Sequence, residues 1–182
     1  MTENLEKARQ ISRLMRYCMV ALAIIVAALT LWSILKAATD PQWLAAILQH
    51  QFGAFAPLVV LPIQTALFIV LNMLQTSAIL VALALLARVF GHISATGGVD
   101  YGTAVYVRRA GIWFGIAALL LVLSTPVSAL IASIGQPEGH RFLTFGLETQ
   151  HLLAVLLSIV LITLGHMLAL AADIAEDNRQ IV

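Results

Sequence analysis

The first long apolar stretch of the chain is YCMVALAIIVAALTLWSIL, residues 17–35, which is bounded by Arg16 and Lys36. A helix needs about 20 mostly apolar residues to cross the roughly 30 Å of hydrocarbon in a bilayer. This stretch meets that requirement and contains no charged residue. We therefore predict a membrane-spanning helix here.

Two further stretches meet the same requirement. Residues 112–134 begin after a pair of arginines, and residues 151–172 end at Asp173. Of the 182 residues, 61% are hydrophobic and 10% are charged, whereas a soluble domain has about 25% charged residues. The sequence thus predicts an integral membrane protein. Its single cysteine, Cys18, excludes a disulfide framework, and its net charge of +1 argues against direct binding of nucleic acid.

The region between the first two of these spans is harder to interpret. Residues 41–87 contain no Asp, Glu, Lys or Arg, so two crossings would fit by length. Polar residues interrupt the first half, however, where Trp43, Leu44, Ile47 and Leu48 share one side of a short helix. That pattern is typical of an amphipathic helix lying in the membrane interface. Only residues 62–90 are therefore predicted to cross.

The distribution of positive charge supports four spans. With one crossing in the middle region, one face of the membrane holds residues 1–16, 91–111 and 173–182. The only lysine and arginine on the other face are then Lys36 and Arg141. The positive-inside rule then places both termini in the cytoplasm. We expect an all-α, single-domain four-helix bundle with short amphipathic interfacial helices, including ones near residues 3–16 and 103–107.

The segments predicted to be cytoplasmic carry charges of both signs. Three arginines at helical spacing suit either anionic lipid headgroups or an acidic partner. The acidic residues near the C-terminus oppose the dipole of the last helix, so solvent, the basic N-terminal helix, the arginine pair or a partner is expected to compensate them. The candidate partner-binding residues are Arg9, Arg13, Arg16, Arg108, Arg109, Asp173, Glu176 and Asp177.

A family resemblance rests on three features. The four-span layout has a glycine-containing connection that ends in VRRAG, residues 107–111, and a last span that continues into AADIAEDNRQIV, residues 171–182. With these features the chain resembles the bacterial domain-of-unknown-function family 2975. The resemblance implies a bacterial inner-membrane protein, often encoded beside a small helix-turn-helix repressor. It implies no catalytic residue.

Histidines are the candidate ligands of a cofactor. His166 lies inside the fourth span, and His92, at the cytoplasmic end of the second, is its one plausible partner for a haem. A structural histidine that bonds to another helix is the alternative. At the other face, Glu148 and His151 share a helix face and could bind a transition metal. The residues that could join them are His50, Glu138 and His140.

Polar residues in the second span are the remaining candidates. Gln64, Asn72 and Gln75 face one side of a helix, which predicts hydrogen bonds between helices or a narrow polar pathway. No span carries Asp, Glu, Lys or Arg near its middle, which argues against an ion-coupled pump. Phosphate-loop, hydrolase, zinc-protease and paired-cysteine motifs are absent from the sequence.

The sequence therefore predicts a non-enzymatic inner-membrane protein that acts as a sensing or regulatory scaffold. A shift among its spans would expose or hide the charged cytoplasmic segments, which would bind a small regulator or a membrane protein. A haem- or metal-binding protein and an accessory subunit of a larger membrane complex are the alternatives. Association with further copies of the chain is compatible with each of these interpretations.

Overall fold

The computed structural model describes residues 2–52, 60–98, 100–134, 136 and 143–180. Within these ranges the chain forms five helices and no strand. Four of them are long and apolar enough to cross a membrane, which confirms the all-α fold and the multi-pass membrane class. The helices are α1 (Thr2–Thr39), α2 (Pro41–Phe52), α3 (Pro62–Thr96), α4 (Tyr101–Ser133) and α5 (Thr149–Gln180).

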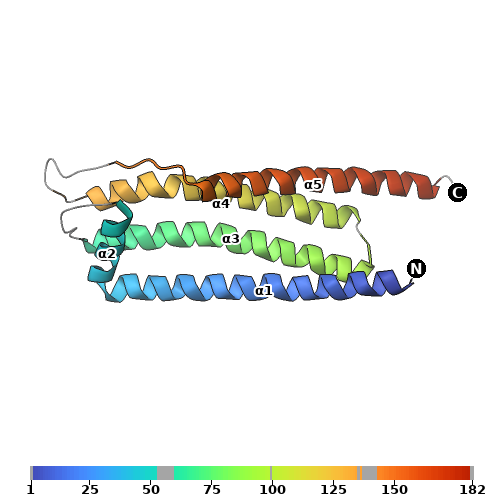
Figure 1. Cartoon of the computed structure of the whole chain (residues 1–182), viewed down its shortest axis with the longest axis horizontal. Coiled ribbons are helices and arrows are strands. Elements are labelled where there is room, and N and C mark those ends of the chain that lie inside the picture. Colours follow the sequence, from blue (N-terminus) through green and yellow to red (C-terminus); the bar gives the residue numbers. More distant parts are fainter. Residues whose placement is uncertain (1, 53–59, 99, 135, 137–142, 181–182) are drawn as a thin grey trace.

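The four long helices lie side by side in the order α1, α3, α4, α5 (Figure 1). Each of them packs extensively only against its neighbours in that order, while the short α2 crosses one end of the row beside α1. Figure 1 shows the two termini and the α3–α4 connection at the opposite end. We call the end of the row that α2 crosses the α2 end, and the end with the two termini the charged end. An even number of crossings places the termini together in this way.

The sharp turn between α3 and α4 follows from two residues. Gly97 has a φ of 75°, in the left-handed region that favours glycine, and its N–H donates to the carbonyl of Ile93 at 2.9 Å. Three residues later the Asp100 carboxylate accepts from the backbone N–H of Thr103 at 2.9 Å and from its hydroxyl at 2.8 Å. One helix is thus closed and the next is capped within a few residues.

Two of the predicted interfacial helices are instead parts of long helices. α1 is continuous from Thr2 and α4 from Tyr101, so residues 3–16 and 103–107 continue the axes of these long helices and do not form separate helices. Lengthening an existing helix adds one hydrogen bond per residue without a new nucleation step. The predicted helix near Trp43 does form: in α2, Leu44 and Leu48 are buried.

Small residues bring α4 and α5 into close contact. A methyl group on Gly111 would lie 2.8 Å from the backbone nitrogen of Ile162, and one on Gly165 would lie 2.7 Å from the backbone nitrogen of Arg108. The buried Ser158 hydroxyl donates to the Gly111 carbonyl at 2.9 Å. Close backbone approach between small residues is a common way for helices to associate in membranes. These contacts fix the register of α5 along α4.

Contacts between neighbouring helices place four arginines at about the same level along the helix axes. The stem of Arg16 lies against Gly91, one turn from Arg88, and the ring of His92 packs near Tyr106, within a turn of Arg108 and Arg109. We call Arg16, Arg88, Arg108 and Arg109 the arginine tier. Lys36 follows Arg16 after about 20 residues, or about 30 Å of helix. That distance matches the hydrocarbon thickness of a bilayer.

Candidate functional site

The charged end has a groove between α1 and α3. It encloses about 560 Å³ and is lined by two arginines, Arg16 and Arg88, together with His92 and Tyr106. Because Gly91 has no side chain, Arg16 can lie against α3: a methyl group there would come within 3.5 Å of Arg16 Cδ. The two guanidinium groups are exposed, so the groove can receive an acidic group from outside the protein.

The other two arginines of α1 have different surroundings. The Arg9 guanidinium covers the end of α3, since a methyl group on Gly97 would lie 3.0 Å from its Nε and Nη2 atoms. The C-terminal carbonyls of a helix carry partial negative charge and favour a cation there. Arg13 is exposed. Arg9 therefore helps to hold α1 on α3, while Arg13 remains accessible.

A histidine and an aspartate face each other beside the groove. His92 Nδ1 lies 3.4 Å from Asp100 Oδ1, although it has no hydrogen-bond partner among the described residues. The backbone N–H of Thr103 is the main reason why the pKa of Asp100 is lowered from its ordinary value of 3.8, and the coulombic effect of His92 adds to it. Asp100 thus carries a negative charge next to the groove at neutral pH.

Removing this cap is expected to destabilise α4. Asp100→Ala should lower the free energy of unfolding by about 1 kcal/mol, whereas Asp100→Asn should lose less because asparagine also caps helices. Since the folded pKa is lowered, the stabilising effect of the carboxylate is complete above pH 3.8 and is lost as the pH falls through the lower, folded value. Unfolding in detergent micelles between pH 2.5 and 7, at about half-unit steps, measures both effects. A wild-type acid dependence that persists in Asp100→Asn would contradict this assignment.

The acidic residues of α5 do not meet the arginines of α1. Asp173 and Asp177 are exposed on α5, at the opposite edge of the row, and α3 and α4 lie between the two edges. In the part of the chain that the structure describes, neither carboxylate forms an ion pair with an arginine of the tier. Because Gly165 contacts Arg108, Asp173 lies about 12 Å beyond that level. The expected compensation within the chain is therefore not seen for these two residues.

The two haem candidates are not brought together. His92 belongs to α3 and faces Asp100, whereas His166 is exposed on α5. α4 packs between these two helices. Among the described residues His166 also forms no hydrogen bond with another helix, so the alternative expectation of a bonded structural histidine is not met either.

The candidate metal ligands form a helix start. The buried ring of His151 accepts a hydrogen bond at its Nδ1 atom from the backbone N–H of Glu148, at 2.9 Å. The Glu148 carboxylate accepts from the amide of Gln150 at 2.6 Å. Glu138 and His140 lie outside the described residues. Within the described ranges no three potential ligands gather into a group that could hold a metal ion.

Arg88 and Tyr106 line the groove but were not among the predicted site residues. The predicted topology held a sign of the first, because it places Arg16 and Arg88 at the same membrane boundary. That α1 and α3 are neighbours depends on packing, which no span prediction supplies.

No family model matches the chain, and no curated protein or solved structure matches it either. The resemblance to family 2975 stays a prediction.

Proposed function

We propose that this chain is a non-enzymatic membrane protein that binds a partner protein through its charged end and serves as a regulatory scaffold. The observation that carries the proposal is the groove between α1 and α3, in which Arg16 and Arg88 line one cavity. An acidic segment of the partner would enter this groove. Exposed Asp173 and Asp177 on α5 would contact basic residues of the same partner, because complementary charges set the orientation of a complex.

The proposed partner is a small cytoplasmic regulator or another membrane protein. This follows the resemblance to family 2975, under which the charged end would face the cytoplasm of a bacterial cell. Both candidates fit an end that presents basic residues on one edge and acidic residues on the other. A further copy of the chain would also carry both charges, so the test below identifies the bound polypeptide.

α1 is the helix best suited to respond to a signal. None of the residues in its most apolar window of 18 is buried, and its Thr30 hydroxyl lies at a long 3.3 Å from the hydroxyl of Thr76 on α3. Moving α1 along α3 therefore loses less buried surface than moving α4 or α5 would. Such a movement would shift Arg16 relative to Arg88 and change the groove.

Charge reversal at the charged end tests the proposal. The variants are Arg13→Glu with Arg16→Glu on α1, and Asp173→Lys with Asp177→Lys on α5. Each double variant is expected to reduce recovery of the polypeptide that co-purifies from native membranes at least about tenfold, because each repels groups that the wild-type protein attracts. Mass spectrometry of the purified complex identifies the partner and measures its amount.

Lys36→Glu is the matched control. Lys36 is an exposed cation of the same helix at the α2 end, and its reversal should leave recovery unchanged. Equal recovery with every variant would contradict the proposal. So would a wild-type protein from which no polypeptide co-purifies in stoichiometric amount.

A further inference from the structure

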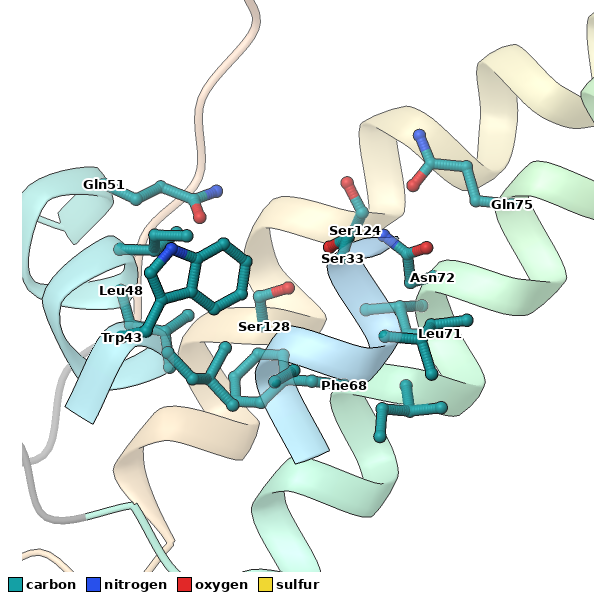
Figure 2. A pocket seen from close by; sticks show the side chains of 15 residues that line it. Ser33, Trp43, Leu48, Gln51, Phe68, Leu71, Asn72, Gln75, Ser124 and Ser128 are labelled. Atoms are coloured by element: carbon teal, nitrogen blue, oxygen red, sulfur yellow. The ribbon is translucent and has the colours of Figure 1, made fainter. Parts of the chain in front are cut away.

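A second cavity lies near the α2 end, far from the charged end. It encloses about 230 Å³ between α1, α2, α3 and α4 (Figure 2). One of its residues, Asn72, precedes Arg88 by about 16 residues, which places it about 24 Å from the arginine tier. A bilayer has about 30 Å of hydrocarbon, so the cavity lies inside the hydrocarbon near its boundary, beneath α2.

The cavity has a polar side. Among the residues that line it, the amides of Asn72 and Gln75 and the hydroxyls of Ser33 and Ser128 form no hydrogen bond with any described residue. Figure 2 shows these groups on three helices around the same space. A polar group without a partner in hydrocarbon is costly. An occupant with hydrogen-bonding atoms would satisfy these donors and acceptors.

The rest of the lining is apolar and aromatic. Trp43 of α2 lies over the cavity in Figure 2, near Phe68 of α3. The rings of Trp43 and Trp32 pack edge to face, with their centroids 6.0 Å apart. The other apolar residues of the lining include Ile34, Leu44, Leu48 and Leu71. The occupant therefore needs an apolar part as well as a polar one.

Charge narrows the class of occupant further. Among the described residues that line the cavity there is no Asp, Glu, Lys, Arg or His. A charged headgroup would lose its hydration without gaining a counter-charge, which is unfavourable at this depth. The volume of about 230 Å³ also exceeds the roughly 30 Å³ that one water molecule takes up in the liquid. The lining therefore favours an uncharged occupant that is larger than a water molecule.

From these observations we infer that the cavity beneath α2 binds a neutral amphiphile. Its uncharged headgroup, bearing hydroxyl or carbonyl oxygens, contacts Asn72, Gln75, Ser33 and Ser128. Its apolar tail lies against Phe68, Leu71 and the apolar face of α2. This site is separate from the groove at the charged end, so it can exist whether or not the charged end binds a protein.

Fluorescence quenching tests the inference. The probe is a monoacylglycerol with bromine on its acyl chain, added to detergent-solubilised protein carrying Trp113→Phe, so that only Trp32 and Trp43 report. Saturable quenching that unbrominated monoacylglycerol reverses is expected. A brominated fatty acid at pH 8.5 should give no saturable component, since its carboxylate is charged.

Variants locate the binding. Asn72→Leu with Gln75→Leu should weaken the saturable component at least about tenfold, because the hydrogen bonds of both amides to the headgroup are lost. Ser77→Ala is the matched control: Ser77 is an exposed residue of the same helix whose hydroxyl bonds to Leu74, and its removal should change nothing. Ser33→Leu, which fills the cavity from α1, should also abolish the saturable quenching. This variant tests the location of binding if the double variant does not fold. Non-saturable quenching of the Trp113→Phe protein, or unchanged binding by the cavity variants, overturns the inference.

Discussion

Gly165→Val should destabilise the protein by about 2–3 kcal/mol, because the added side chain cannot fit between α4 and α5. A Cβ at this position would lie 2.7, 2.8 and 2.9 Å from the N, Cβ and Cα atoms of Arg108. Two of these atoms belong to the backbone, which cannot move away as the end of a side chain can. The helices would separate and lose contacts along their length. Unfolding by titration with a denaturing detergent measures the loss.

Gly146→Val is the control for the first prediction. Gly146 precedes α5 and has no heavy atom within 4 Å of the position that a Cβ would take. It is also not a positive-φ glycine. The same substitution should therefore change stability by less than about 0.5 kcal/mol. Similar stabilities of the two variants would show that α4 and α5 are farther apart than the structure indicates.

The second large loss of stability is expected from substitution of Gln64. Its side chain is 1% exposed and joins α3 to the end of α4, with the amide nitrogen donating to the carbonyls of Ile131 at 2.8 Å and Ile134 at 2.6 Å. Its Oε1 atom accepts from the backbone N–H of Leu61 at 2.6 Å. Gln64→Leu leaves these groups unpaired and should lower the free energy of unfolding by about 2–3 kcal/mol.

Gln64→Glu separates the two roles of this side chain. A carboxylate can still accept from Leu61 but faces the oxygens of Ile131 and Ile134, so this variant should be less stable than Gln64→Leu at neutral pH. Thr65→Val, one residue along, replaces only a long 3.5 Å contact to Leu61 and should be nearly neutral. The same denaturing-detergent titration ranks the three variants. If Gln64→Leu matched Thr65→Val, the link between α3 and α4 would carry little stability.

The polar face of α3 shows how far the sequence could be interpreted. The helical spacing of Gln64, Asn72 and Gln75 correctly predicts that they share a side, yet only Gln64 bonds to another helix. Gln64 lies opposite the last turn of α4, where carbonyls have no partner within their own helix. Asn72 and Gln75 lie farther from that end of α4, beside Ser124 and Ser128, and neither bonds to α4. The sequence does not contain the register that makes this difference.

The charged segments show the same limit. The apolar stretches were enough to predict four long helices, and the glycine-containing connection before residues 107–111 lies where α3 gives way to α4. An amphipathic segment such as residues 3–16 is equally compatible with a membrane surface and with a neighbouring helix. α3 continues past Arg88 to Thr96, and the N-terminal part of α1 packs against this extension. That choice depends on tertiary contacts.

The serial packing of the row has a consequence for biosynthesis. Each long helix docks mainly on the one made before it: α3 on α1, α4 on α3, and α5 on α4. No later helix has to enter between two that have already associated. Helices that insert independently can then associate in the order of synthesis, so the nascent chain can assemble as each segment leaves the translocation channel, before the ribosome has completed the protein.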